Sequence, residues 1–371
     1  MIMDNTPHAN NFISDIPDRP PLVILTGPTA VGKTALSVNL AKKIGGEIIS
    51  ADSMQVYRRM DIGSAKVTKE EMQGVPHYLI DEFEPDEEFH VVKFQEYAKR
   101  YIQEIHSRGK IPILVGGTGF YIQAVLYDID FTENGGDMTY RRFLEDLAHT
   151  QGAHVLHEML REVDPASADA IHENNVKRVI RALEFYHETG QKISDHNEAE
   201  RQKTSPYHFA YFVLNDDRAH LYDRIDHRVD AMIEAGLVDE VRALQQDGCT
   251  RDMVSMQGLG YKEILDYLNG DLSLEEAIRI LKRDTRHFAK RQITWFKREK
   301  DVIWVNRPEF EGENAILAYI EEQLRAKNLI RRDPRQWGIP YELASDNKKY
   351  AVPISAKNLI RRDPRQWGDP L

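Results

Sequence analysis

Short runs of consecutive apolar residues recur along the chain, separated by longer stretches of helical spacing. Such runs are typical of strands in a parallel sheet, because helices cover both faces of that sheet. Apolar residues at every third or fourth position follow several of the runs, which is the order of βαβ units. The expected strands are Leu22–Thr26, Glu47–Ala51, Ile111–Val115, Phe209–Leu214 and Val302–Val305. The pattern predicts an α/β fold built on a parallel sheet.

Changes in this pattern divide the chain into parts. Residues 1–20 are polar and contain several prolines, so we expect a loose leader there. Near Phe131 the sequence becomes polar and glycine-containing, and helical spacing then dominates. We therefore expect a helical insertion at residues 131–200, within a core formed by residues 21–130 and 201–324.

The segment after Leu324 contains an identical duplication. Residues 326–338, AKNLIRRDPRQWG, recur at 356–368. Folded solenoids usually have three or more repeats that differ in sequence, so two identical copies favour a recent duplication or a scar of cloning or frameshift. A basic tail that binds RNA is the functional alternative. We expect residues 325–371 to be disordered and dispensable for fold and activity.

Composition is that of a globular protein. Charged residues make up 29% and hydrophobic residues 41%, and no apolar run is long enough to cross a bilayer. The single cysteine, Cys249, excludes an internal disulfide and a cysteine-based zinc site, which suits a reducing compartment. We expect a cytoplasmic monomer with no membrane association and no obligate protein partner. A net charge of −11 argues against a uniformly basic nucleic-acid binder, although a local basic face is compatible with it.

The first βα connection has the sequence of a phosphate-binding loop. The motif consists of Gly27, Pro28, Thr29, Ala30, Val31, Gly32, Lys33 and Thr34. In such a P-loop the backbone N–H groups face phosphate oxygens, the lysine supplies a charge, and the threonine hydroxyl can bind Mg²⁺. We expect a P-loop NTPase-like fold, in which a parallel sheet has flanking helices and a helical insertion domain. The motif predicts a di- or triphosphate ligand and leaves open whether that ligand is a nucleotide.

Two further strand ends carry candidate chemistry. Asp52 follows the second expected strand, at the sheet edge where ligands of open α/β sheets bind. Its carboxylate suits a proton acceptor or a water-mediated Mg²⁺ ligand, and the alternative is a helix cap. The strand Ile111–Val115 leads into Gly-Gly-Thr118-Gly instead of the aspartate of motor-type ATPases, which disfavours an ATPase. Thr118 is either a substrate contact or an incidental turn residue.

A basic segment, Arg279–Lys300, combines many lysines and arginines with Phe288, Trp295 and Phe296. This composition suits contacts to a nucleic-acid backbone with aromatic support. An amphipathic helix with aromatic residues in the core and cations in solvent has the same pattern and is the commoner case. The segment alone is compatible with both interpretations.

Seven blocks, in order, resemble the bacterial tRNA dimethylallyltransferase family. They are GPTAVGKT (27–34), ISADSMQVYRRMDIGSAK (49–66), VPHYLID (75–81), LVGGTGFYIQAVL (114–126), KRVIRALE (177–184), GLGYKEI (258–264) and FAKRQITWFKR (288–298). The resemblance covers residues 21–324. Members transfer a dimethylallyl group from dimethylallyl pyrophosphate to N6 of the adenine 3′ of the anticodon, at position 37, with Mg²⁺ as cofactor. The resemblance implies that the P-loop holds the pyrophosphate of this donor.

The resemblance also implies roles for individual residues. Asp52 would accept the proton of the adenine amino group, and Thr118 would contact the adenine. Arg224, or with less support Arg228, would reach the pyrophosphate. The implied contacts to the tRNA anticodon stem-loop are Asp52, Ser53, Met54, Gln55, Thr118, Lys177, Arg178, Val179, Ile180 and Arg181. The chain departs from the family at Lys177, where glutamine is common, and at Ser64, where threonine is usual.

Other activities remain compatible with a P-loop. One is a small-molecule kinase that uses ATP, and another is an isopentenyltransferase acting on free adenine nucleotides. An RNA-binding GTPase has less support, because the chain lacks the guanine-selecting Asn-Lys-x-Asp motif. The basic segment and the helical insertion favour RNA over a free nucleotide as the acceptor.

Overall fold

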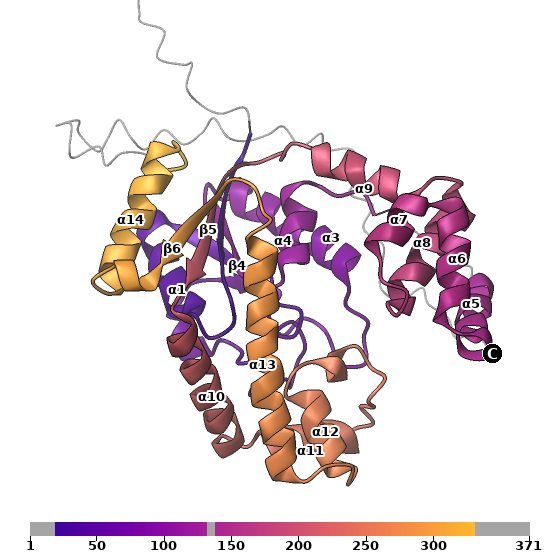
Figure 1. The fold of residues 1–371 in the computed structure, drawn as a ribbon. Coiled ribbons are helices and arrows are strands. Elements are labelled where there is room, and N and C mark those ends of the chain that lie inside the picture. The colour runs from indigo at the N-terminus through magenta and orange to yellow at the C-terminus, as the bar shows by residue number, and fades with distance from the viewer. Residues whose placement is uncertain (1–18, 132–137, 331–371) are drawn as a thin grey trace, which may run out of the picture.

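The computed structural model describes residues 19–131 and 138–330, and these form a sheet of six parallel strands (Figure 1). In chain order the strands are β1 (Pro21–Thr26), β2 (Gly46–Ser50), β3 (His77–Tyr78), β4 (Ile111–Gly116), β5 (His208–Asn215) and β6 (Val302–Asn306). Their spatial order is β3-β2-β4-β1-β5-β6. The strand before the P-loop therefore lies inside the sheet, between β4 and β5. The predicted α/β fold with a parallel sheet is confirmed.

The helices fall into three groups. Those that pack on the sheet are α1 (Lys33–Ile44), α3 (Val91–Ser107), α4 (Gly119–Leu126) and α14 (Glu313–Ala326). An extension at the bottom of Figure 1 contains α10 (Arg218–Glu234), α11 (Leu237–Gln246), η1 (Ser255–Gln257), α12 (Tyr261–Leu268) and α13 (Leu274–Phe296). A helical lobe, residues 138–202, contains α5 (Met138–Gln151), α6 (Ala153–Val163), α7 (Pro165–Ala170), α8 (Val176–Thr189) and α9 (Ile193–Gln202). The short helices α2 (Lys69–Met72) and η2 (Arg307–Glu309) lie in connections.

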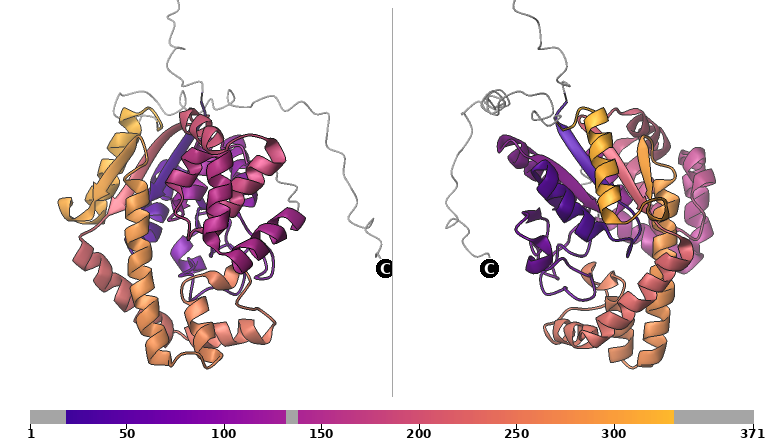
Figure 2. Two further views of the ribbon diagram at one scale, coloured as in Figure 1. Left: turned by 45° about the vertical axis from the view of Figure 1, so that its right-hand side comes forward. Right: turned by 90° about the vertical axis from the view of Figure 1, so that its left-hand side faces the viewer.

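Alternate residues of β1 enter two different cores. Leu22 and Ile24 pack into the core that includes α3 and α4, whereas Val23 and Leu25 pack into the core that includes α1 and α14. All four side chains are fully buried. In the right-hand view of Figure 2 the yellow α14 lies in front of the strands. Helices on both faces explain why β1 is apolar at successive positions.

The helical lobe has a hydrophobic core of its own. Leu144, Leu156, Leu160 and Leu183 are buried within it, and they belong to neither core of the sheet. Figure 1 places α5 to α8 at the right, away from the strands. The segment expected to form a helical insertion, residues 131–200, corresponds to this lobe, apart from residues 132–137, which lie outside the described ranges. None of the helices in the described ranges is long and apolar enough to cross a membrane.

Two features differ from the expectations. The proline-containing stretch after α2 holds β3, a two-residue strand that pairs with Ile48 and Ile49 of β2. The core was expected to end at Leu324, but α14 continues to Ala326 and Leu329 is only 5% exposed. The first copy of the duplicated segment thus begins inside the fold, because Leu329 packs into the core of α1 and α14. Residues 331–371 of the expected tail, and residues 1–18 of the expected leader, lie outside the described ranges.

Candidate functional site

The P-loop joins β1 to the N-terminus of α1 at the carboxyl edge of the sheet. Gly32, the residue before the helix, has a φ of 94°, a left-handed conformation that residues with a Cβ adopt at a cost. Ala30 and Val31 have buried side chains, so they offer a ligand only their backbone. The N–H groups and the positive dipole end of a helix N-terminus favour an anion. The loop is therefore suited to bind a phosphate group.

Lys33 lies across the P-loop. Its Nζ donates hydrogen bonds to the carbonyl oxygens of Gly27 at 2.9 Å and Pro28 at 2.8 Å. Burial lowers the pKa of Lys33 from 10.5 to about 7, the negative charge of Asp52 opposes this shift, and the positive charge of Arg228 adds to it. A polyanion bound at the loop would favour the charged ammonium and raise this pKa again.

Asp52 follows β2 and closes a turn made with Ser53, Met54 and Gln55. Its Oδ1 accepts hydrogen bonds from the backbone N–H groups of Met54 at 2.9 Å and Gln55 at 3.3 Å. No helix begins at this turn, so the structural alternative to a catalytic role is a turn cap and not a helix cap. The half-buried carboxylate also acts electrostatically on Lys33. Asp52 thus combines a local structural role with proximity to the P-loop.

Thr118 precedes α4 and lies beside the turn of Asp52. Its backbone N–H donates a hydrogen bond to the carbonyl oxygen of Ala51 at 3.2 Å. A Cβ on Gly116 would collide with the same carbonyl group, so the close approach of these two strand ends requires glycine. Adjacent strands, β2 and β4, therefore bring Asp52 and Thr118 together at one edge of the sheet.

A buried glutamine on α13 links the P-loop to the Thr118 loop. Gln292 accepts a hydrogen bond from the N–H of Thr29 at 2.9 Å and donates one to the carbonyl oxygen of Gly117 at 2.9 Å. Sequence reasoning missed this residue. The helical spacing of the sequence could have indicated it, because Gln292 lies on the same helix face as Ala289 and Phe296, which are both fully buried. A polar residue on a buried helix face requires hydrogen-bond partners.

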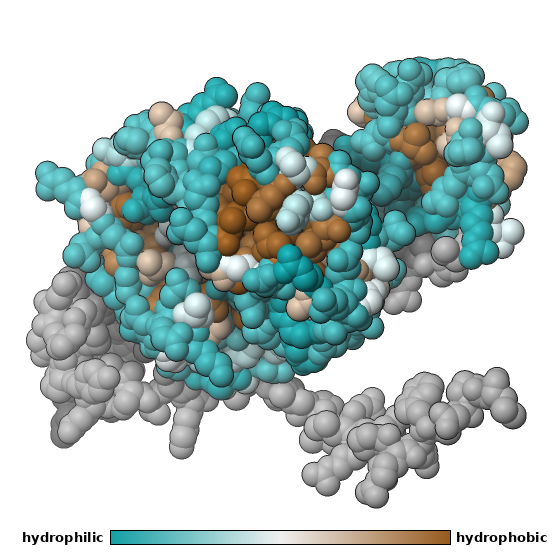
Figure 3. Space-filling model, turned by 90° about the horizontal axis from the view of Figure 1, so that it is seen from below, coloured by the Kyte–Doolittle hydropathy of each residue, from teal (hydrophilic) through white to brown (hydrophobic). Residues whose placement is uncertain are grey.

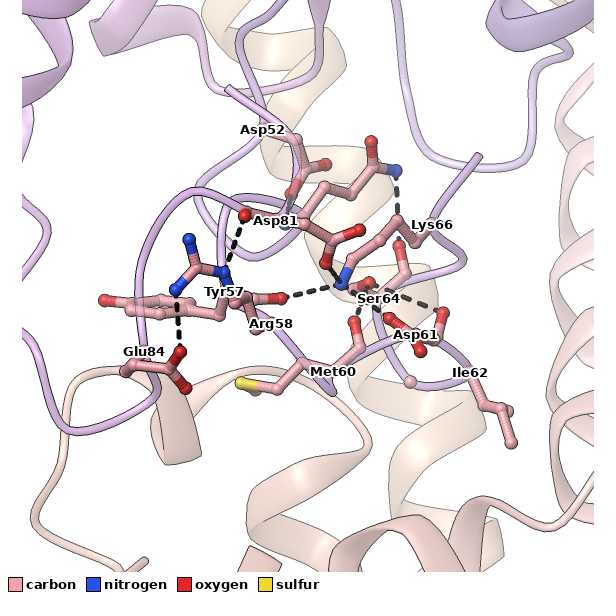
Figure 4. Close-up of polar contacts among 12 residues, drawn as sticks. Asp52, Tyr57, Arg58, Met60, Asp61, Ile62, Ser64, Lys66, Asp81 and Glu84 are labelled. Carbon is pink, nitrogen blue, oxygen red and sulfur yellow. Dashed lines mark hydrogen bonds and ion pairs between the residues drawn. The ribbon is translucent and has the colours of Figure 1, made fainter. Parts of the chain in front are cut away.

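An internal cation holds the loop that follows Asp52. The Nζ of Lys66 donates hydrogen bonds to the carbonyl oxygen of Tyr57 at 2.7 Å and to the carboxylates of Asp61 and Asp81 at 2.6 and 2.5 Å (Figure 4). Only 5% of the Lys66 side chain is exposed. This network fixes the path of the chain after Asp52 and so supports the position of its carboxylate.

Thr34 is an exposed residue in the first turn of α1. Within the described ranges, no group of three or more histidines, cysteines or carboxylates is arranged to hold a metal ion. Mg²⁺ usually keeps several waters and binds one or two protein oxygens together with substrate phosphates. The Thr34 hydroxyl at the P-loop and the Asp52 carboxylate, which follows β2 at the same edge of the sheet, fit a magnesium ion that arrives with a polyphosphate.

Two arginines of α10 contribute positive charge to the P-loop. A Cβ built on Gly32 would lie 3.3 Å from Nη2 of Arg224, whose guanidinium is also 3.6 Å from the carboxylate of Asp216. Arg228 is one helical turn further on, and its pKa is lowered by burial and by the charge of Arg224. Arg224 is therefore next to the loop, and Arg228 is within electrostatic range of Lys33.

A cleft of about 2010 Å³ lies between the helical lobe and the rest of the molecule. Arg178 and Arg181 of α8 line one side, and Arg298 and Lys300, which follow α13, line the other. These four cations have no ion-pair partner in the described part of the chain. Figure 3 shows this junction from below, with hydrophilic surface on both the lobe at the upper right and the main body. The cleft can therefore contact a polyanion from two sides.

An aromatic group forms part of the cleft wall beside Thr118. Phe120 is 41% exposed, and its ring centroid is 5.8 Å from that of Phe131 and 6.3 Å from that of Trp295. The cleft is not uniformly basic, since acidic residues such as Glu299 also line it. Burial raises the pKa of Glu299 to about 7, which reduces its negative charge near neutral pH. The wall thus offers apolar ring faces between cations, as proteins that stack on unpaired bases do.

The predicted tRNA contacts on α8 differ in accessibility. Val179 and Ile180 are 0% and 4% exposed and pack in the core of the helical lobe, so their side chains cannot contact a ligand. This correction follows from helical geometry, which turns consecutive residues to different faces. Lys177 is exposed but does not line the cleft, whereas Arg178 and Arg181 do.

The basic segment forms most of α13, and its two halves differ. In the first half, Lys282 and Arg286 form ion pairs with Asp230 and Asp226 of α10, at 2.6 and 2.5 Å. In the second half of the segment, which continues just beyond the end of α13, four cations have no ion-pair partner among the described residues: Lys290, Arg291, Lys297 and Arg298. Several of them line a second pocket that shares Trp295 and Arg298 with the cleft. The first half of the segment is thus an amphipathic helix with paired cations, and contact of the second half with a nucleic-acid backbone stays a prediction.

The fold and the site together define a P-loop protein with a phosphate site next to a large, partly cationic cleft. A model of the IPP transferase family matches residues 55–299. The tRNA dimethylallyltransferase of Lachnoclostridium phytofermentans is 64% identical over 311 residues, which cover 84% of this chain and 99% of that protein. The tRNA dimethylallyltransferase of Bacillus cereus is 52% identical over 310 residues, which cover 84% of this chain and 97% of the relative.

Solved structures give the same result. The tRNA isopentenylpyrophosphate transferase of Bacillus halodurans superposes with a TM-score of 0.64 at 47% identity, covering 84% of this chain and 98% of that one. A eukaryotic dimethylallyltransferase acting on tRNA has a TM-score of 0.72 at 30% identity, covering 85% and 81%. This chain belongs to the bacterial tRNA dimethylallyltransferase family.

Proposed function

We propose that the chain transfers a dimethylallyl group from dimethylallyl pyrophosphate to N6 of adenine 37, just 3′ of the anticodon in tRNA. The observation that carries this proposal is the position of α4. Thr118 at its start lies beside Asp52 and the P-loop, while Phe120 and Gln123 on the same helix line the large cleft. A phosphate site and a macromolecular cleft therefore meet at one short helix.

The P-loop side of the site suits the donor. Breaking the allylic C–O bond leaves its electron pair on pyrophosphate, and the loop amides, Lys33 and Arg224 are placed to stabilise that charge. Mg²⁺ bound by Thr34 and the phosphates would supply further charge neutralisation. The donor would then lie with its allylic carbon toward Asp52 and Thr118.

The acceptor side suits an adenine. As the new C–N bond forms, the N6 amino group loses a proton, and the Asp52 carboxylate is the base that we assign to it. Asp52 is held by its turn and is adjacent to Thr118, which we assign to the adenine ring. Bases in an RNA loop are unpaired and can be turned out of the stack for a few kcal/mol.

The cleft favours tRNA over a free adenine nucleotide. Pockets for small molecules typically measure about 300–1,000 Å³, whereas this cleft measures about 2010 Å³. Arg178 and Arg181 line one wall and Arg298 lines the other, and several cations on opposite walls suit a chain of phosphates better than a single nucleotide. The relatives and solved structures named above are transferases that act on tRNA, and none of these four is a kinase.

Mass spectrometry of nucleosides tests the proposal. Unmodified tRNA is incubated with the protein, Mg²⁺ and dimethylallyl pyrophosphate, then digested. The expected product is N6-isopentenyladenosine, confined to position 37 and absent when adenine nucleotides replace tRNA. Modification of free nucleotides with untouched tRNA would support the alternative acceptor, and the absence of any prenylated product would refute the proposal.

A further inference from the structure

Arg307 is the first residue after β6, and the sheet brings it to the P-loop. The edge strand β6 pairs with β5 up to the pair Asn215 and Asn306, so the chain leaves the sheet at its carboxyl edge. The P-loop leaves the sheet at the same edge, two strands away. Arg307 lies outside the seven blocks of the family resemblance, and no role was expected for it.

The guanidinium of Arg307 lies close to Gly32. A Cβ built on Gly32 would be 3.1 Å from Nη1 of Arg307, 3.6 Å from its Cζ and 3.3 Å from Nη2 of Arg224. Two guanidinium groups, from α10 and from the end of β6, therefore converge on the left-handed residue of the P-loop. A side chain at residue 32 would fill the space that they face.

This convergence leaves positive charge uncompensated. Nη1 of Arg307 is buried and has no hydrogen-bond partner, and Arg307 forms no ion pair within the described ranges. Arg224 has one carboxylate, Asp216, at 3.6 Å. Arg228 and Lys33 add further positive charge nearby, and burial lowers the pKa of both. A buried donor without a partner costs free energy unless a ligand supplies the acceptor.

We propose that Arg307 is a pyrophosphate-binding residue that, together with Arg224, forms a two-arginine clamp over the P-loop. Guanidinium groups donate paired hydrogen bonds to phosphate oxygens, and two of them converging on one site can hold both phosphates of one diphosphate. The inference deepens the proposed function, on which it rests for the identity of the donor. It assigns to the donor a contact from the residue that directly follows the last strand of the sheet.

Binding of inorganic pyrophosphate tests the clamp without requiring catalysis. Affinity is measured by calorimetry on the full chain with Mg²⁺ and no tRNA, for the wild type and for Arg307→Gln. Losing a hydrogen bond to a charged group should weaken binding by about 10- to 100-fold. Arg325→Gln is the matched control, because Arg325 pairs with Glu321 on the surface of α14, and its pyrophosphate affinity should equal that of the wild type.

The melting temperature and the KM for tRNA distinguish a role of Arg307 in pyrophosphate binding from a role in the stability of the fold. Removing an unpaired buried donor should leave the melting temperature of the ligand-free protein unchanged or higher, and the KM for tRNA unchanged. Arg307→Lys keeps the positive charge but lacks the planar guanidinium that donates paired hydrogen bonds. It should therefore have a higher pyrophosphate affinity than Arg307→Gln and a lower one than the wild type. The double variant with Arg224→Gln should lose less affinity than the product of the two single-variant effects if both side chains hold the same anion.

The outcomes are distinct. Unchanged pyrophosphate affinity in Arg307→Gln would overturn the clamp, and so would a lowered melting temperature with unaltered affinity of the folded fraction. If Arg307→Gln fails to fold, the affinity of Arg307→Lys decides, and an unaltered value overturns the inference. If the wild type binds pyrophosphate through Arg307 but does not prenylate tRNA, the clamp stands and the proposed function fails.

Discussion

Lys33 and Asp52 have opposite charges at one edge of the sheet, and the charge of Asp52 acts on the pKa of Lys33. Burial alone would make Lys33 release its proton easily, and the carboxylate of Asp52 counteracts this. The P-loop motif and the aspartate that follows β2 are thus electrostatically linked.

Asp52→Asn should separate catalysis from structure. Asparagine retains an Oδ1 that can accept the N–H groups of Met54 and Gln55, so the turn and the melting temperature should be preserved. The variant cannot accept the N6 proton, so turnover should fall by roughly 10²–10⁴ with tRNA affinity changed only a few-fold. Single-turnover kinetics and thermal melting measure both effects. A lower melting temperature with a normal rate per folded molecule would show that Asp52 is only a turn cap.

The lowered pKa of Lys33 predicts proton uptake on binding. At a pH above about 7 much of the free protein has neutral Lys33, whereas bound pyrophosphate favours the charged ammonium. Pyrophosphate binding should therefore take up a proton, and the affinity should fall as the pH rises. Lys33→Arg stays charged throughout and is the control for the titration of pyrophosphate itself. Calorimetry in buffers of different ionisation enthalpy measures the uptake. Equal uptake by the wild type and Lys33→Arg would contradict the shifted pKa.

At the scale of elements, α13 connects three parts of the molecule. Its first half forms ion pairs with α10, Gln292 joins the P-loop to the Thr118 loop, and its end lines the cleft. This one helix therefore contacts both the P-loop and the cleft. We expect its functional cations to be those that have no ion-pair partner among the described residues.

The second half of the basic segment, Arg279–Lys300, should bind tRNA. Replacing Arg291 and Lys297 by alanine should weaken tRNA binding and lower the log–log salt slope by about 0.7 to 0.9 for each phosphate that is no longer neutralised. Pyrophosphate affinity should not change. The control replaces Lys282 and Arg286, which already pair with Asp230 and Asp226, and should leave the salt slope as in the wild type. If the salt slope of tRNA binding were equal in both double variants, the cations of the second half would only be solvated charges on a helix surface.

For the whole molecule, the sequence predicts those parts that local patterns determine. The strands β1, β4, β5 and β6 are short apolar runs, and Gly32 and Lys33 belong to a motif with one known geometry. The two-residue strand β3 was not predicted, because it has too few residues to show a pattern. Gln292 and Arg307 were missed for another reason. Both reach the P-loop from segments distant in sequence, and only the folded topology brings them there.

The C-terminal boundary leads to a prediction at this scale. Truncation after Leu324 removes Leu329, which is buried against the core of α1 and α14, and should lower the free energy of unfolding by about 1.5–3 kcal/mol. Truncation after Ile330 should leave it unchanged. Urea denaturation of the two truncated chains and the full chain measures the difference. Equal stability of all three would show that Leu329 contributes nothing to the fold.

We expect the P-loop to hold the pyrophosphate of a prenyl donor and not to use ATP. A single reaction that contains tRNA, dimethylallyl pyrophosphate and ATP tests this when released pyrophosphate, ADP, phosphate and prenylated tRNA are all quantified. We predict one pyrophosphate for each prenylated tRNA, no ADP, and a rate about 10²–10³-fold lower for Lys33→Ala, as when one preorganised donor is removed. ATP acting as a weak competitor is compatible with this result. Catalytic release of ADP or phosphate from ATP when the allylic donor is omitted would contradict the claim and support a kinase.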